Sequence, residues 1–152
     1  LLVLLGLVVL GMVFAMQPAR KRTQRKKAEQ DKRVYLVHAD NLHYDQYLNG
    51  DAQVLNGNVH FRHVGANLYC DSAHFYEQSN SFEAFGHVKM VQGDTLRLTS
   101  DYAFYNGDDQ LAQARRNVVL KHRKTTLYTD SLDYDRMYSF GNFFEVGKLV
   151  DG

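Results

Sequence analysis

The side chains that could do chemistry in this sequence are seven histidines, one cysteine and a series of aspartates. His60 and His63 are three residues apart, a spacing that turns side chains to opposite faces of a strand and suits no shared metal ion. Cys70, the single cysteine, excludes an intramolecular disulfide and a cysteine-based zinc site. HExxH motifs, nucleophile motifs and glycine-rich phosphate loops are absent from the sequence. We therefore expect no metal site, no cofactor and no enzymatic activity.

The aspartates recur at a regular spacing. Asp40, Asp71, Asp101 and Asp130 each open a short similar segment, and the steps between them are 31, 30 and 29 residues. A calcium site needs several oxygen ligands within one short loop, so aspartates spaced this far apart are too sparse. We expect each aspartate instead to bond backbone N–H groups at a turn or a bulge.

Two further landmarks indicate that the body of the chain is a repeat of about 30 residues. The first follows each aspartate: Gly57-Asn-Val59, Gly86-His-Val88, Arg116-Asn-Val118 and Gly147-Lys-Leu149. The second closes the first three units: Leu68-Tyr-Cys70, Leu96-Arg-Leu98 and Leu127-Tyr-Thr129. Arg116 stands where a glycine is expected, which argues against a tight bend there but not against the strand.

The repeat has the pattern of strands. Val59-His-Phe61, Val88-Lys-Met90 and Leu96-Arg-Leu98 alternate apolar and polar residues, which is typical of strands with one buried face. Asn49-Gly50 and Asn106-Gly107 predict two-residue hairpin turns. Turn signals every 8–12 residues or so favour an all-β sandwich, roll or barrel.

Alternation leaves one question open in the strands that carry the aspartates. If Leu96 points inward, strict alternation also turns Tyr102 inward. In the first unit, however, Leu42 and Tyr44 share the parity of the aspartate. Either a β-bulge at each aspartate switches the faces, or both faces of these strands are covered.

The N-terminal part of the sequence differs from the body. Residues 1–16 have no polar side chain, and as a helix they would span roughly 24 Å, somewhat less than a bilayer core of roughly 30 Å. We expect an apolar N-terminal helix that is either a cleaved signal peptide or a membrane anchor. A basic linker, 17–33, follows with eight Lys/Arg and two acidic residues, whereas 34–152 carries ten Lys/Arg and fifteen Asp/Glu. The acidic balance of the body argues against binding to nucleic acid.

The signatures Gly57-Asn-Val-His-Phe61 and Gly86-His-Val-Lys-Met90 resemble those of the OstA-like (organic solvent tolerance) family, which includes the LptA and LptC lipopolysaccharide-transport proteins. The resemblance covers about residues 34–152 and predicts one OstA-like β-repeat domain there. The fourth unit stops at Gly152 in the middle of a repeat, so we expect the domain to be truncated at the C-terminus. It implies an open, twisted β-jellyroll of short antiparallel strands, whose apolar interior carries the acyl chains of lipopolysaccharide across the periplasm. It also implies that units stack edge to edge, and it carries over no catalytic residues.

A lipid-binding groove would be lined by the inward residues of the alternating strands. These candidates are Val59, Phe61, Leu68, Val88, Met90, Leu96, Leu98, Val118, Leu120 and Leu127. Ordinary core packing explains each of them equally well, and only a hollow lined by the set would indicate lipid binding. The basic residues of the domain gather at Arg115, Arg116, Lys121, His122, Arg123 and Lys124. They would either meet lipid phosphates or blunt an exposed strand edge.

Together these observations predict a non-enzymatic periplasmic module of a Gram-negative bacterium that carries lipopolysaccharide or a related acylated lipid toward the outer membrane. Its expected partners are that lipid, other Lpt-type β-jellyroll proteins and the membrane, through the N-terminal segment. The alternative is an exported β-repeat scaffold with a filled core and no lipid cargo. A small enzyme or a sugar-binding jellyroll would need a convergent polar cluster, which the sequence does not show.

Overall fold

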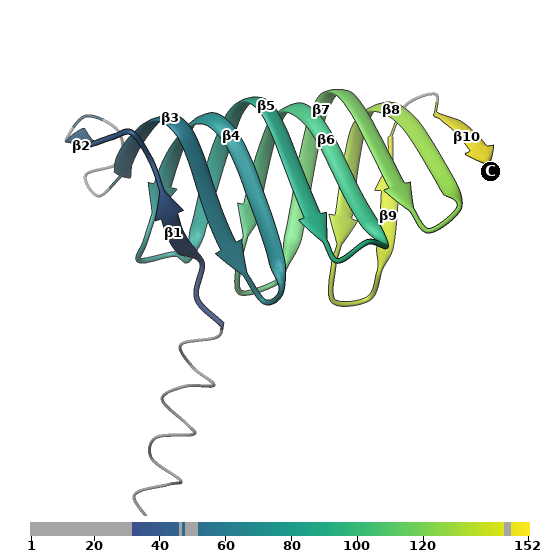
Figure 1. Ribbon diagram of the computed structural model, residues 1–152, viewed down its shortest axis with the longest axis horizontal. Coiled ribbons are helices and arrows are strands. Elements are labelled where there is room, and N and C mark those ends of the chain that lie inside the picture. Colours follow the sequence, from purple (N-terminus) through teal and green to yellow (C-terminus); the bar gives the residue numbers. More distant parts are fainter. Residues whose placement is uncertain (1–31, 46, 48–51, 145–146) are drawn as a thin grey trace, which may run out of the picture.

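The computed structural model describes residues 32–45, 47, 52–144 and 147–152 (Figure 1). Within these ranges the chain forms a single antiparallel sheet. Its strands are β1 (Tyr35–His38), β2 (Asn41–Asp45), β3 (Ala52–His63), β4 (Ala66–Tyr76), β5 (Ser81–Gln92), β6 (Leu96–Asn106), β7 (Leu111–His122), β8 (Thr125–Asp135), β9 (Phe140–Phe143) and β10 (Lys148–Asp151). The described ranges hold no helix that is long and apolar enough to span a bilayer. The helix predicted at 1–16 and most of the basic linker lie outside the described residues.

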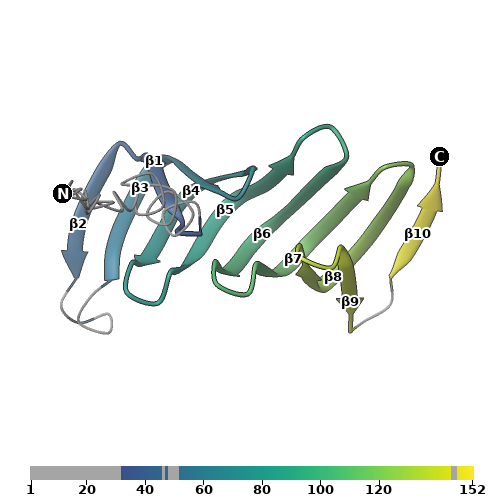
Figure 2. The same ribbon diagram turned by 90° about the horizontal axis from the view of Figure 1, so that it is seen from below.

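Neighbours in the sequence are neighbours in the sheet. The order is β1-β3-β4-β5-β6-β7-β8-β10, with β2 also paired to β3 and β9 also paired to β8. The long strands arch over the molecule and are joined by turns below (Figure 1), and they run obliquely to its long axis when seen from below (Figure 2). The described sheet does not close on itself, because β1 and β10 lie at opposite ends of the order. The prediction of an open, all-β antiparallel fold is therefore confirmed.

Each arch is a strand bent in its middle, where the pairing slips. The register shifts between Asn56 and Val59, and again at the equivalent points of β5 and β7. Two consecutive residues adopt positive φ at each point: Gly57 (78°) and Asn58 (47°), Gly86 (74°) and His87 (45°), and Arg116 (63°) and Asn117 (52°). These corners form a ridge along the molecule. They divide each strand into two halves, so that the sheet folds into two facing walls.

Wall 1 is the part of the folded sheet that contains 59–63, 66–70, 88–92, 96–100, 118–122 and 125–129. Wall 2 contains 52–56, 72–76, 81–85, 102–106, 111–115 and 131–135. The walls meet at the ridge, and we call the opposite side, where the strand ends and turns of the two walls face each other, the mouth (Figure 1). Side chains between the walls make up the core of the protein.

The recurrent aspartates lie on the ridge, and their side chains join neighbouring corners. The bonded pairs are Asn58 Nδ2 to Asp40 Oδ2 (2.9 Å), His87 Nδ1 with Asp71 Oδ2 (2.7 Å) and Asn117 Nδ2 to Asp101 Oδ2 (2.6 Å). Only Asp130 accepts from a backbone N–H of a corner, that of Asn117, at 3.2 Å. The predicted turn or bulge is thus present at the aspartates, but most of these carboxylates bond side chains rather than the backbone.

The register shift beside Asp71, Asp101 and Asp130 switches the buried face of their strands, which favours the alternative of a bulge near the aspartate. In β6, Leu98 and Ser100 are buried, Asp101 is exposed, and the next buried residues are Ala103 and Tyr105. The buried set thus changes parity across the aspartate. The same change occurs in β4 and β8.

The third corner forms a tight bend in spite of its arginine, so the argument from Arg116 against a bend was wrong. Its φ of 63° matches the left-handed values at the two glycine corners. Its guanidinium lies over the Tyr102 ring at 5.8 Å, outside the sheet. Glycine is the better fit at the other corners, because a Cβ on Gly57 would lie 2.3 Å from the Asp40 carboxylate.

Two turns differ from the sequence prediction. Asn106-Gly107 does not form a two-residue hairpin, because the connection between β6 and β7 takes in 107–110. The Asn106 Oδ1 atom instead accepts from the Asp108 backbone N–H at 2.9 Å. A two-residue turn lies at Val64-Gly65, where both residues have positive φ. Asn49-Gly50 lies outside the described residues.

Candidate functional site

The inner face of wall 1 carries the predicted groove-lining residues. All ten are buried there, with exposed fractions between 0% and 8%. They are Val59, Phe61, Leu68, Val88, Met90, Leu96, Leu98, Val118, Leu120 and Leu127. Every one comes from wall 1, and wall 2 supplies an opposing set that the sequence analysis did not name: Leu55, Ala73, Phe75, Phe82, Ala84, Ala103, Tyr105, Ala112, Ala114, Leu132 and Tyr134.

The middle of this interior is filled by side chains. Phe61 of wall 1 stacks on Phe82 of wall 2, with ring centroids 4.2 Å apart and an interplanar angle of 14°. Phe75 and Tyr105 lie against the same pair, at 5.3 Å from Phe61 and 5.4 Å from Phe82. Aromatic contacts across the walls hold them together, so core packing accounts for this part of the predicted groove.

A hollow of about 600 Å³ opens at the C-terminal end of the interior, in the size range of small-molecule sites. Apolar side chains make up much of its lining, and basic side chains stand at its rim. The lining residues are Leu120, His122, Arg123, Lys124, Thr125, Leu127, Tyr134, Ser139, Gly141, Phe143 and Leu149. Leu120 and Leu127 are the two predicted residues that line it. Val59 and Val118 instead border shallow hollows on the ridge, and the other six border none of the hollows described here.

The predicted basic patch is split between two sites. Arg115 pairs with Asp133 of the neighbouring strand at 2.9 Å, and Arg116 belongs to the ridge. His122, Arg123 and Lys124 lie at the mouth and border the 600 Å³ hollow. Only this second group is placed to meet a ligand in the hollow.

A polar clasp across the mouth closes the interior beside the filled core. His63 Nδ1 bonds the Tyr105 hydroxyl at 2.8 Å, which joins wall 1 to wall 2. The Arg136 guanidinium donates to the same hydroxyl at 2.5 Å and to the backbone carbonyl of Val64 at 2.9 Å. Gln92 Oε1 accepts from Arg136 Nε at 3.2 Å. We call His63, Gln92, Tyr105 and Arg136 the clasp.

Burial dominates the electrostatics of the clasp. Desolvation lowers the pKa of His63, and the Arg136 charge lowers it further, whereas its bond to the Lys32 carbonyl acts in the opposite direction. Desolvation also raises the pKa of the Tyr105 hydroxyl, and Arg136 opposes that rise. Both side chains are therefore neutral near pH 7, and Arg136 carries the charge of the clasp.

The start of the described chain crosses the mouth next to the clasp. The Val34 N–H donates to Asn80 Oδ1 at 2.7 Å, and Asn80 Nδ2 donates to the Lys32 carbonyl at 3.0 Å. His63 Nε2 bonds the same carbonyl at 2.8 Å. Val34 and Asn80 are both buried. We call residues 32–34 the strap, because they tie wall 1 to the turns of wall 2.

Sequence reasoning missed the clasp and the strap for a physical reason. Arg136 follows an expected strand in a stretch rich in polar residues, where a charged side chain is normally solvated. Its partners Val64 and Gln92 are 72 and 44 residues away in the sequence. The one available signal was the alternation of β3, which turns His63 inward with Val59 and Phe61.

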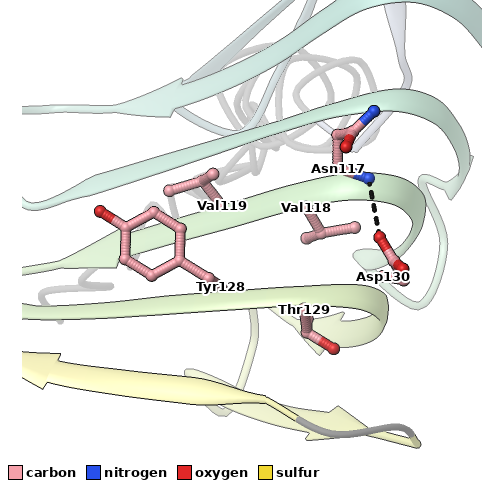
Figure 3. A pocket seen from close by; sticks show the side chains of 6 residues that line it. All are labelled: Asn117, Val118, Val119, Tyr128, Thr129 and Asp130. Atoms are coloured by element: carbon pink, nitrogen blue, oxygen red, sulfur yellow. Dashed lines mark hydrogen bonds between the residues drawn. The ribbon is translucent and has the colours of Figure 1, made fainter.

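The outer surface has polar contacts of its own. A hollow of about 320 Å³ lies at the third corner, where Asn117 of β7 and Asp130 of β8 are joined by a hydrogen bond (Figure 3). On wall 2, Glu83 accepts hydrogen bonds from the Tyr76 and Tyr102 hydroxyls at 2.8 and 2.9 Å. Burial and this shared carboxylate raise the pKa of each tyrosine to about 12.

The remaining groups that could do chemistry are held in structural contacts. Burial raises the pKa of the Cys70 thiol to about 12, which disfavours a thiolate. On the ridge, the hydrogen bond that His87 Nδ1 donates to the Asp71 carboxylate raises the pKa of His87. His60 stacks on the outer Tyr69 ring at 4.4 Å, whereas His63 points inward, as their spacing predicted. In the part of the chain that the structure describes, no group of three or more His, Cys, Asp or Glu is arranged to hold a metal ion.

The family assignment rests on a match over most of the chain. The model of the family described as "OstA-like protein" matches residues 31–152. The chain belongs to the OstA-like family. None of the curated proteins matches the sequence. The match to the family model confirms the resemblance drawn from the two glycine signatures.

A solved structure has the same fold as this OstA-like chain. It is LptH of Pseudomonas aeruginosa, whose structure is described as the LptA homologous periplasmic component of the conserved lipopolysaccharide transport device. The TM-score is 0.68 and the identity 12%, over 78% of this chain and 94% of that chain. At this identity the likeness establishes the fold, and the LptA-like jellyroll predicted for the body of the chain is confirmed at that level.

Proposed function

We propose that this OstA-like protein is a non-enzymatic periplasmic carrier of lipopolysaccharide, or of a related acylated lipid, toward the outer membrane. The observation that carries the proposal is the apolar hollow of about 600 Å³ that continues the inner face of the walls. Burial of a hydrocarbon chain is favourable by about 0.8 kcal/mol per CH₂ group, so a hollow of this lining would hold an acyl chain without specific polar contacts. Family membership and the fold shared with a periplasmic transport component support it.

The rest of the molecule would serve the same task. Residues 1–16 would attach or export the chain, 17–33 would act as the basic linker, and 34–152 would form the carrier domain. The exposed strands at either end of the sheet would pair with other Lpt-type jellyrolls, since an unpaired strand edge accepts another strand. His122, Arg123 and Lys124 would face the anionic part of the lipid.

The test is displacement of an apolar fluorescent probe by lipopolysaccharide, compared in two neighbouring variants of β10. Leu149 borders the hollow and Val150 does not, although both side chains are partly exposed, at 63% and 39%. We expect Leu149→Asp to weaken uptake about tenfold, since it places a charge in an apolar site, and Val150→Asp to leave it within about twofold. Circular dichroism and urea midpoints would verify that both variants fold.

Two results would count against a lipid carrier. One is no probe uptake and no bound lipid at saturating concentrations. The other is an equal effect of the two substitutions, which would place uptake outside the hollow.

The alternative function is an interaction scaffold without cargo. The stack of Phe61 on Phe82 and the complete burial of both rings favour it, since no ligand can enter the middle of the interior without separating the walls. The same experiment separates the two proposals, because a scaffold would take up neither the probe nor the lipid.

A further inference from the structure

Arg136 is a buried cation at the edge of an otherwise apolar interior. It is 7% exposed and lies in the turn that follows β8. Its hydrogen bonds go to the Tyr105 hydroxyl, to the Val64 carbonyl and, through Nε and Nη2, to Gln92 Oε1. Each of these acceptors is neutral. The Tyr105 ring, 5.9 Å from the guanidinium carbon, adds a cation–π contact.

No carboxylate is paired with Arg136 in the part of the chain that the structure describes. Among the described residues, none of the ion pairs includes Arg136, whereas Arg115 in wall 2 is paired with Asp133 at 2.9 Å. Removing a guanidinium from water without a counter-charge is unfavourable, and its planar fork matches the oxygens of a carboxylate or phosphate. The two arginines therefore differ in kind: the charge of Arg115 is neutralised inside the protein, and that of Arg136 is not.

Two hollows are bordered by residues that adjoin Arg136 in the chain or in the clasp, although Arg136 itself lines neither of them. The outer one, of about 320 Å³, is bordered by His63 and Val64 of wall 1 and by Met137, the residue after Arg136. The inner one, of about 600 Å³, is bordered by Tyr134 and Ser139. Arg136 is thus flanked along the chain by residues of both hollows, in the part of the mouth where the charged head of a ligand with its hydrocarbon chain in the inner hollow would lie.

The other charged groups near Arg136 do not neutralise its guanidinium. Asp108 borders the outer hollow, but it is exposed, and its Oδ1 accepts from Asn80 Nδ2 at 2.8 Å. Asp135 Oδ1 accepts the Met137 and Tyr138 backbone N–H groups. Lys32 borders the outer hollow and adds a second cation there.

We propose that Arg136 is the binding site for the anionic group, a phosphate or a carboxylate, of an acylated lipid whose chain occupies the inner hollow. The neutral groups of the clasp hold the guanidinium in place without neutralising it. An anionic oxygen then replaces Gln92 or the Tyr105 hydroxyl as the acceptor and releases one bond across the mouth. The inference rests on the proposed function and deepens it, since it assigns the head group to a residue outside the basic rim of His122, Arg123 and Lys124.

The test uses the full chain and two amphiphiles with the same alkyl chain, hexadecyl phosphate and the neutral hexadecyl glycerol, as competitors of an apolar fluorescent probe. We expect the wild-type protein to prefer the phosphate about tenfold, the typical value of one charge-assisted pair. Arg136→Gln should abolish that preference and keep the affinity for the neutral amphiphile within about twofold. Arg97→Gln, a matched change at an exposed position of β6 that borders neither hollow, should keep the preference.

A second measurement needs no variant and covers the case in which Arg136→Gln fails to fold. The ¹⁵N resonance of Arg136 Nε should shift when hexadecyl phosphate is added to the wild-type protein, and stay in place with hexadecyl glycerol. Inorganic phosphate at the same concentration should leave it unchanged, because the chain supplies the affinity. An equal shift with inorganic phosphate would mean a site for a free anion and would overturn the lipid assignment.

The failures of the two proposals are distinguishable. Uptake of both amphiphiles with equal affinity, or a preference that is kept in Arg136→Gln, overturns the role of Arg136 and leaves the carrier function standing. Absence of probe uptake with either amphiphile overturns both.

Discussion

The shape of this protein depends on a few residues that adopt left-handed backbone conformations. At the ridge, Gly86 and His87 turn β5 from one wall to the other, and the Asp71 side chain occupies the space beside Gly86. The third corner shows that the bend does not require glycine, since Arg116 adopts a similar φ. What glycine contributes at the second corner is room for the carboxylate of the neighbouring strand.

A pair of glycine substitutions separates these two contributions. Gly86 and Gly65 have the same φ, 74°, but a Cβ on Gly86 would lie 2.4 Å from Asp71 Oδ2, whereas a Cβ on Gly65 meets nothing within 4 Å. We expect Gly65→Ala to lower the free energy of unfolding by about 1 kcal/mol, from the left-handed conformation alone. Gly86→Ala should lower it by about 2–3 kcal/mol, because the Asp71 carboxylate must also move. Urea denaturation measures both values, and equal losses would mean that the contact with Asp71 does not matter.

At the scale of the strand, alternation predicts the inward face only between the corners. The candidates from wall 1 were placed correctly because strands such as 59–63 and 96–100 alternate without interruption. The sequence does not indicate where the parity changes, since the residues around Asp101 fit the apolar pattern with either face of β6 turned inward. Tyr105 therefore escaped the candidate set, although it is completely buried.

Two phenylalanines of β5 test this assignment of faces. Phe82 is completely buried between the walls, and Phe85, three residues on, packs on the outer surface against His74 and Tyr102. Phe82→Ala should cost about 3–5 kcal/mol, as large-to-small changes in cores do. Phe85→Ala should cost about 1–2 kcal/mol, the value of its aromatic contacts and partial burial. The free energies of unfolding in urea check the order, and the reverse order would mean that the faces of wall 2 are assigned wrongly.

At the scale of the whole molecule, the contacts across the mouth are the feature that the pairing of neighbouring strands does not predict. Strand pairing joins only residues of adjacent arches, whereas the clasp and the strap join residues 31 to 72 positions apart across the two walls. Such contacts follow from the angle between the walls, which the corners set. The local sequence around Arg136 or Asn80 carries no comparable signal, and this is why the buried face of wall 1 was predictable and the contacts across the mouth were not.

The strap provides the test at this scale. Asn80 is 3% exposed and is the acceptor for the Val34 N–H, so Asn80→Ala leaves a buried donor without that partner, at a cost of about 1–3 kcal/mol. If the strap is held to wall 2 through Asn80, the hydrogen-exchange protection of the Val34 amide should fall about tenfold or more, since 1.4 kcal/mol corresponds to a factor of ten. Asn67→Ala is the matched control, because Asn67 bonds His60 at 2.9 Å on the outer side of wall 1 and makes no contact with the strap. Exchange of Val34 that responds equally to both variants would show that the strap is held by its pairing to wall 1 alone, and that the two walls are joined at this end without it.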